Sequence, residues 1–130
     1  MRFARLLVFD DEPTICGLIA DFAGEAEFDV VSATDLAGFL AHLGGAPADA
    51  IMIDLNIPGV DTADVMRHIA ESRREAAIML MTGADEQAFV VAERLGRDHG
   101  LRICGRLQKP FSLDGFIARM KRLRAEIGHC

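Results

Sequence analysis

Several features typical of membrane-bound, secreted or disulfide-rich proteins are missing from this sequence of 130 residues. No apolar run approaches the roughly 18 residues that a membrane-spanning helix needs, and the first residues lack the apolar core of a signal peptide. The three cysteines lack CxxC or other metal-ligand spacing, and an odd number makes a poor disulfide framework. We therefore expect a protein of the reducing cytoplasm with no membrane partner.

Positive charge is also scarce. Fourteen basic residues against twenty acidic ones give a formal net charge of -6, which disfavours broad binding to nucleic acids or anionic membranes. The basic side chains between Arg119 and Arg124 are typical of the solvated face of an amphipathic helix. We expect no nucleic-acid partner, and a basic surface on a partner protein is the better match.

The length and the hydrophobic content of 51% fit one domain with one buried core, and no internal repeat or low-complexity stretch divides the chain. We expect residues 1–130 to form a single domain. Short strand-like runs alternate with segments of helical period, which predicts an α/β fold with a parallel sheet covered by helices on both faces. The predicted strands are 5–9, 29–33, 50–53, 77–81 and 102–107.

Gly105 and Arg106 interrupt the last predicted strand, which is therefore expected at a sheet edge. The sequence also marks where the helices begin. Pro13 suits a first helical turn, and hydroxyl or carboxylate side chains suit the residue that caps a helix. The predicted helices start at Pro13, after Thr34, at Asp61 or Thr62, at Asp85 and after Ser112.

Polar residues follow four of the predicted strands: Asp10 and Asp11, then Asp54, Thr82 and Lys109. The carboxyl ends of parallel strands meet at one edge of a sheet, where such folds bind ligands. Three carboxylates at one place disfavour each other's ionisation unless a cation joins them. Because Mg²⁺ prefers oxygen ligands, it is the expected cofactor.

These residues suit phosphoryl transfer. A carboxylate such as Asp54 can attack phosphorus and form an acyl phosphate. Such a reaction needs positioning and neutralisation of charge on the phosphoryl oxygens. Asp10 and Asp11 would hold the metal, Lys109 would pair with one phosphoryl oxygen, and Thr82 would donate a hydrogen bond to another.

Four short motifs occur in order at these strand ends: DDEP from Asp10, DLNIPG from Asp54, TG from Thr82 and KPF from Lys109. Together they resemble the receiver domain of two-component response regulators, over essentially the whole chain. The resemblance implies a flavodoxin-like fold, with five helices around a five-stranded parallel sheet of order 2-1-3-4-5.

The resemblance also implies roles for residues. Asp54 would accept a phosphoryl group from a phosphohistidine on a sensor histidine kinase or a phosphotransfer protein. Asp11 and Asp54 would bind Mg²⁺ directly with the backbone carbonyl of Asn56, while Asp10 would act largely through water. The peptide bond before Pro110 would be cis. Such a domain is a signalling phosphoacceptor that assists only its own phosphorylation and dephosphorylation, and is not an enzyme.

One residue departs from the family pattern. Arg106 stands three residues before Lys109, where an aromatic residue usually swings inward on phosphorylation. An outward signalling contact to an acidic group on a partner is one hypothesis for Arg106, and a solvated edge-strand arginine is the other. In the family, the first helix, with Ile15 and Leu18 here, and the loop after strand five usually dock the kinase. Strand five and the last helix usually form the dimer or effector face.

Three alternative functions stay open from the sequence. A Mg²⁺-dependent phosphohydrolase using Asp54 is disfavoured, because Asn56 stands where an acid or base would serve. A receiver-like scaffold could dimerise or dock without phosphorylation. The segment 101–111 is also similar to receivers joined to cyclic-di-GMP phosphodiesterase domains, so the chain could be the N-terminal receiver of a longer protein.

Overall fold

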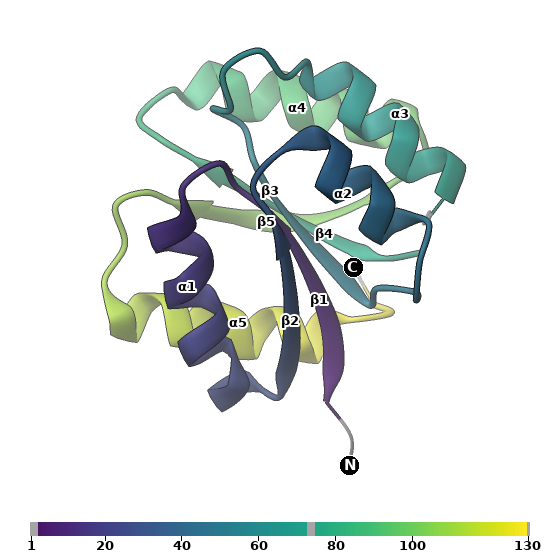
Figure 1. Cartoon of the computed structure of the whole chain (residues 1–130). Helices are drawn as coiled ribbons and strands as arrows, with labels where there is room; N and C mark the ends of the chain where they lie inside the picture. Colours follow the sequence, from purple (N-terminus) through teal and green to yellow (C-terminus); the bar gives the residue numbers. More distant parts are fainter. Residues whose placement is uncertain (1–2, 73–74, 130) are drawn as a thin grey trace.

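The chain folds into an α/β structure with five parallel strands in the order β2-β1-β3-β4-β5, as a computed structural model of residues 3–72 and 75–129 shows (Figure 1). The predicted sheet is confirmed, and each strand differs from its predicted range by at most one residue at either end. The strands are β1 (Ala4–Phe9), β2 (Phe28–Ala33), β3 (Ala50–Asp54), β4 (Ala77–Thr82) and β5 (Arg102–Gln108).

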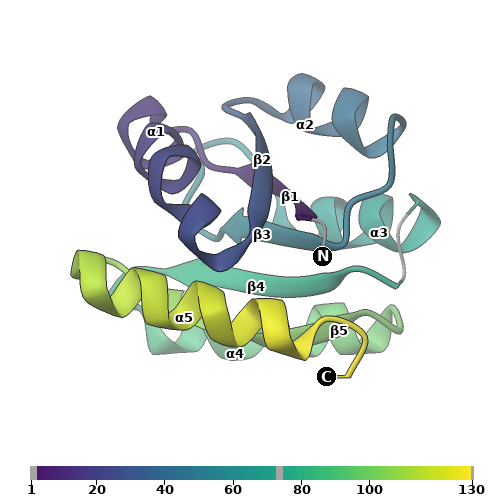
Figure 2. The same ribbon diagram turned by 90° about the horizontal axis from the view of Figure 1, so that it is seen from below.

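The helices cover both faces of the sheet. They are α1 (Pro13–Phe22), α2 (Leu36–Leu43), α3 (Thr62–Ser72), α4 (Glu86–Asp98) and α5 (Leu113–Glu126), with a short 3₁₀ helix η1 (Ala23–Ala26) after α1. On one face α1 and α5 pack on the sheet, and on the other α2, α3 and α4 do so. Figure 2 shows α5 running alongside β4, and both β4 and β5 contact this helix.

The two faces of β1 explain why its sequence is apolar throughout. Leu6 and Val8 point into the cluster of α1 and α5, whereas Leu7 and Phe9 point into the other cluster, where Phe9 stacks on Phe39 of α2. Every residue of β3 and β4 is buried. A parallel sheet buried on both faces requires such runs, and it holds the strand ends in fixed positions.

The helix starts agree with the sequence except at α2. Asp85 and Ser112 cap α4 and α5, accepting hydrogen bonds from Ala88 N (3.1 Å) and Gly115 N (3.0 Å). The predicted cap Thr34 is wrong. Asp35 caps α2 instead, because its carboxylate accepts from Gly38 N at 2.7 Å.

β5 is an edge strand, as predicted, and it carries a bulge. Ile78 and Met79 of β4 pair with Ile103 and Gly105, so one extra residue lies in β5. Gly105 has φ +134°, and a Cβ there would lie 2.0 Å from Nη2 of Arg119, which donates to the Cys104 carbonyl at 3.0 Å. Glycine is therefore required at this position.

The cysteines and helix lengths complete the comparison with the sequence. Cys16 is a free, buried thiol, whereas Cys104 is disulfide-bonded, although an odd number of cysteines predicts a poor disulfide framework. Cys130 lies outside the described residues. Within the described part of the chain, every helix is too short or too polar to cross a membrane.

Candidate functional site

The ends of four strands bring the predicted polar residues together. Asp54 and Thr82 are the last residues of β3 and β4, Asp10 follows β1, and Lys109 follows β5. A backbone hydrogen bond of 2.6 Å from Lys109 N to Thr82 O joins the last two strand ends, and the Lys109–Pro110 peptide is cis, as predicted. Asp10, Asp54 and Thr82 are the buried polar or charged residues of the described chain.

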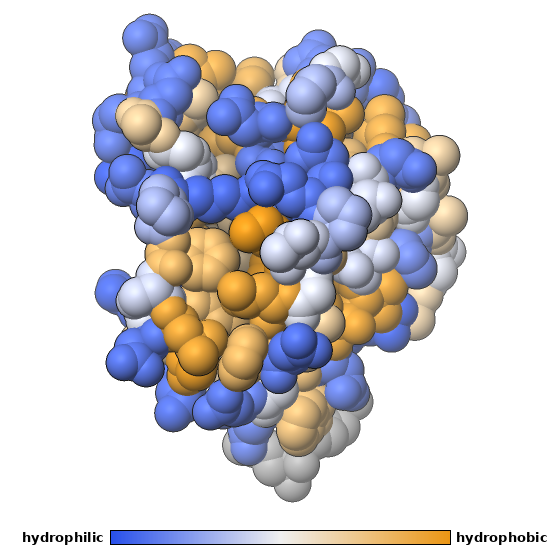
Figure 3. Space-filling view, turned by 60° about the vertical axis from the view of Figure 1, so that its left-hand side comes forward, coloured by the Kyte–Doolittle hydropathy of each residue, from blue (hydrophilic) through white to orange (hydrophobic). Residues whose placement is uncertain are grey.

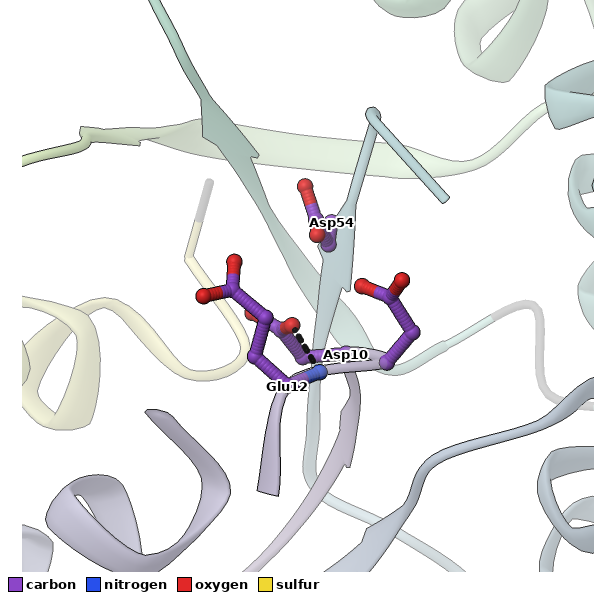
Figure 4. A group of neighbouring side chains, drawn as sticks. Asp10, Glu12 and Asp54 are labelled. Carbon is purple, nitrogen blue, oxygen red and sulfur yellow. Dashed lines mark hydrogen bonds between the residues drawn. The ribbon is translucent and has the colours of Figure 1, made fainter. Parts of the chain in front are cut away.

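Four carboxyl groups form one cluster at this edge. Asp10, Asp11, Glu12 and Asp54 each offer an oxygen, and these four atoms lie within 4.8 Å of one another (Figure 4). Backbone amides fix two of them, because Glu12 N donates to Asp10 Oδ1 at 2.9 Å and Asn56 N donates to Asp54 Oδ1 at 3.0 Å. The loops after β1 and β3 thus orient the carboxylates of Asp10 and Asp54.

One ammonium group lies among these carboxylates. Lys109 Nζ is 2.7 Å from Asp10 Oδ2, 3.3 Å from Asp54 Oδ2 and 3.3 Å from Glu12 Oε1. The first two acceptors are buried, while the Glu12 side chain is 59% exposed. Lys109 therefore links strand ends that are far apart in the sequence.

Burial and charge shift the protonation of both partners. Burial raises the pKa of Asp10, assisted by the negative charge of Asp54, although hydrogen bonds from Lys109 and the Glu12 amide oppose the rise. Burial alone lowers the pKa of Lys109, but its hydrogen bond to Asp10 and the charges of Asp54 and Asp10 outweigh this, so its pKa is raised. Lys109 is therefore charged at neutral pH.

The cluster fits a hard divalent cation. Four carboxyl groups lie beside a single ammonium, so carboxylates outnumber cations in this cluster. Oxygen donors in this number suit Mg²⁺, whose charge would relieve the repulsion. Asp10, Asp11 and Asp54 could hold it, while a role for the Asn56 carbonyl stays a prediction.

Two residues near the predicted site were missed by sequence reasoning. Glu12 was only part of the quoted DDEP motif, yet it contacts Lys109; its place directly after the acidic pair was the available signal. Glu86 was not singled out, yet its carboxylate accepts a hydrogen bond from Arg106 Nη1. No local pattern pairs Glu86 with a residue twenty positions away.

Arg106 lies outside the crevice, on the surface between α4 and β5. Its guanidinium pairs with Glu86 in the first turn of α4, and its Cζ lies 4.5 Å from the centre of the Phe89 ring. The acidic partner of Arg106 in this structure is therefore a residue of the same chain. The contacts tie β5 to the start of α4.

The family model for the response regulator receiver domain matches residues 6–121. The transcriptional regulatory protein TcrA of Mycobacterium tuberculosis H37Rv is 30% identical over 120 residues, covering 92% of this chain and 45% of TcrA. AruR of Pseudomonas aeruginosa PAO1 is 30% identical over 132 residues, covering 96% of this chain and 51% of AruR. The chain thus spans about half the length of these relatives.

Solved structures show the same fold. NtrX from Brucella abortus, crystallised with ATP, has a TM-score of 0.80 at 23% identity, covering 94% of this chain and 27% of NtrX. Chemotaxis protein CheY4 of Vibrio cholerae has a TM-score of 0.76 at 23% identity, covering 93% of this chain and 98% of CheY4. With the family match over most of its length, this chain belongs to the response regulator receiver domains of two-component systems and has their flavodoxin-like fold.

Proposed function

We propose that this domain is a phosphoacceptor that takes a phosphoryl group onto Asp54 from a phosphohistidine of a sensor histidine kinase or a phosphotransfer protein. The observation that carries this proposal is the position of Asp54. Its buried carboxylate ends a central strand, beside the Asp10–Asp11 pair and 3.3 Å from the Lys109 ammonium.

The residues divide the work of the transfer. An oxygen of Asp54 forms the new bond to phosphorus while the bond from phosphorus to the histidine nitrogen breaks, and its electron pair returns to the imidazole ring. Mg²⁺, when held by Asp10, Asp11 and Asp54 with the Asn56 carbonyl, supplies positive charge to the phosphoryl oxygens. Lys109 pairs with one phosphoryl oxygen, and the Thr82 hydroxyl donates to another.

The reaction is a signalling event, and the domain promotes only its own phosphorylation and dephosphorylation. Asn56, two residues after Asp54, carries no acid or base that would serve a phosphohydrolase. Phosphohistidine donors form at the expense of ATP, so the proposed place of action is the cytoplasm. The acidic net charge of -6 supports a protein partner and no nucleic acid or membrane partner for this domain.

An apolar surface beside the crevice supports kinase docking. Figure 3 shows hydrophobic side chains gathered over α1 and the start of α5, next to a hydrophilic region. In α1 and in the segment before α5, Ile15, Leu18 and Phe111 are only partly buried, and Leu113 at the start of α5 is exposed. The kinase or phosphotransfer protein would cover this surface and bring its phosphohistidine to Asp54.

Arg106 carries the proposed signal away from the site. A guanidinium is costly to desolvate, so Arg106 is poorly suited to swing into the apolar interior as an aromatic residue would. It instead contacts Glu86 and Phe89, at the start of the helix that follows Thr82 by a three-residue loop. Movement of Thr82 towards a phosphoryl group would shift α4 and change these contacts.

The output of the domain depends on what it joins or meets. A homodimer through β5 and α5, or an effector on the same face, would read the state of Arg106. The relatives are named transcriptional regulators and are about twice as long as this chain, so an output domain in a longer protein is one arrangement. A cyclic-di-GMP phosphodiesterase domain is another, and a scaffold that works without phosphorylation is the competing proposal.

Mass spectrometry tests the proposed function. Incubation with acetyl phosphate and Mg²⁺ is expected to add the mass of one phosphoryl group to the wild type, and none after chelation of the metal. Asp54→Ala is expected to abolish the gain. Asp98→Ala, at the far end of α4, is the matched control and should retain it. A wild type that gains no phosphoryl group would favour the scaffold, and sustained turnover of a phosphate ester would favour the phosphohydrolase.

A further inference from the structure

The Lys109 ammonium uses all three of its protons on carboxylates. Its acceptors are Asp10 at 2.7 Å, Glu12 at 3.3 Å and Asp54 at 3.3 Å. A lysine ammonium has three donors and no more. A phosphoryl oxygen on Asp54 can therefore gain a hydrogen bond from Lys109 only if one of these three contacts is given up.

The three contacts differ in what their loss would cost. The Asp10 side chain is 0% exposed, so its carboxylate would be left buried without its cation. The Asp54 side chain is 3% exposed, and its oxygen that is not bonded to phosphorus would stay a buried acceptor. The Glu12 carboxylate is largely exposed, and water can replace the ammonium there. Glu12 is the acceptor that releases Lys109 most easily.

Hydrogen bonds hold the backbone of Glu12 in place, so the length of its side chain decides whether the carboxylate reaches Lys109. Its amide donates to Asp10, and its carbonyl accepts from Ile15 N and Cys16 N at 3.1 Å each, at the start of α1. Figure 4 shows Glu12 and Asp10 next to each other at the end of β1. From this point a glutamate reaches Lys109, whereas an aspartate is one methylene shorter.

We propose that Glu12 is a positioning residue that occupies the third donor of Lys109 in the phosphoryl-free state and competes with the phosphoryl group for it. The inference rests on the proposed function, because it needs Lys109 to bind a phosphoryl oxygen. Glu12 thereby sets how readily the domain accepts and holds the phosphoryl group. It is not required for the transfer itself.

The test uses beryllofluoride with Mg²⁺ as the probe of phosphoryl binding, followed by fluorine NMR or calorimetry. Glu12→Gln keeps the length of the side chain and removes its charge. Glu12→Asp keeps the charge and shortens the side chain, so that the contact with Lys109 is lost. Both are expected to bind beryllofluoride about two- to fivefold more tightly than the wild type, the size of a weak exposed ion pair. Glu25→Gln, a distant exposed glutamate, should bind as the wild type does.

The outcomes separate the possible explanations. Glu12→Asp binding like the wild type while Glu12→Gln binds more tightly would mean that only the charge matters, which overturns the positioning role. Both variants binding like the wild type would overturn it too, while leaving Asp54 as the acceptor. Mg²⁺ affinity in the absence of beryllofluoride, expected to stay within about twofold in Glu12→Asp, excludes an indirect effect through the metal. A wild type that binds no beryllofluoride would overturn the proposed function together with this inference.

Discussion

The crevice around Asp54 and the surface around Arg106 both depend on charged side chains, but they are built differently. In the crevice, Asp10, Asp54 and Lys109 are buried or nearly so, and four strand ends hold them. At the surface, the Arg106 and Glu86 side chains are 37% and 67% exposed. The sheet therefore fixes the proposed acceptor site, whereas the proposed outgoing signal depends on contacts that are easily exchanged.

The charged contacts of the two regions should also differ in how much they contribute to stability. Losing one partner of a buried charged pair costs about 3–5 kcal/mol, because the other charge stays without compensation. An exposed ion pair contributes about 0.2–1 kcal/mol, and an exposed cation–π contact about 0.5–1 kcal/mol. Contacts of the smaller size suit a switch, because binding elsewhere in the molecule can overcome them.

The largest expected effect comes from Lys109→Gln. Removing the ammonium should weaken beryllofluoride binding by at least about tenfold, since a charge-assisted hydrogen bond to the phosphoryl mimic is lost. The same variant should bind Mg²⁺ more tightly, because the metal no longer competes with a fixed cation for Asp10 and Asp54. Calorimetry suits both measurements, since the chain has no tryptophan.

Lys121→Gln is the matched control for this variant, because it removes the only other lysine of the chain, on α5. It should leave both affinities unchanged. Opposite changes for the metal and the phosphoryl mimic in Lys109→Gln are the distinguishing result. If both affinities stay at wild-type values, Lys109 does not bind the phosphoryl group.

A smaller and more local effect is expected from Arg106→Ala. The variant should still gain one phosphoryl group from acetyl phosphate and lose only about 1 kcal/mol of stability, because its contacts are exposed. In the wild type, beryllofluoride should shift the amide NMR signals of β5 and the first turn of α4. In Arg106→Ala, the shifts should be confined to the crevice.

Glu86→Gln should reproduce this confinement, since it removes the acidic partner of Arg106. The double variant should then add little to either single variant, as expected for two residues that act through one contact. Equal signal shifts across α4 and β5 in all variants, or unchanged binding of an identified effector to Arg106→Ala, would remove Arg106 from the signalling path.

The last expected effect is the dependence of metal binding on pH. Burial raises the pKa of Asp10 above its ordinary 3.8, so Asp10 takes up a proton at a higher pH than an exposed aspartate does. Mg²⁺ binds the ionised carboxylate. The stabilisation of the folded state by Mg²⁺, about 1.4 kcal/mol at a Mg²⁺ concentration of ten times Kd, should therefore fall as pH drops through the raised pKa of Asp10. Urea titrations with and without Mg²⁺ measure this difference.

The metal-free protein should respond with the opposite sign. Ionised Asp10 is disfavoured in the folded state, so its penalty is present above the raised pKa and is relieved as pH falls through it. The stabilising contribution of Lys109 is fully present below the ordinary lysine value of 10.5, so it does not change in this range. An Asp10→Asn variant that loses Mg²⁺ stabilisation at the same pH as the wild type would show that another group titrates.

The sequence could predict the crevice because each of its residues follows from a local pattern. A buried parallel strand reads as a continuous apolar run, and the polar residue after it, such as Asp54, must lie at the carboxyl edge of the sheet. The same reasoning placed β5 at the edge through Gly105. Sheet topology then brought together residues that are about a hundred positions apart.

The missed features depend on which of several nearby side chains makes a contact. Thr34 and Asp35 are both acceptable helix caps, and only the geometry at Gly38 selects Asp35. The contact of Arg106 with Glu86 joins two elements through exposed side chains with many rotamers, which no pattern specifies. Glu12 was adjacent to the predicted pair, but its reach to Lys109 follows only from the turn that starts α1.

The most direct test of the central claim locates the phosphoryl group. The wild type is incubated with acetyl phosphate and Mg²⁺ and reduced with borohydride, which converts an aspartyl phosphate to homoserine, and its peptides are then sequenced by mass spectrometry. The account predicts homoserine at position 54, with Asp10, Asp11 and Asp61 unchanged. Homoserine at another position, or at none, would contradict it.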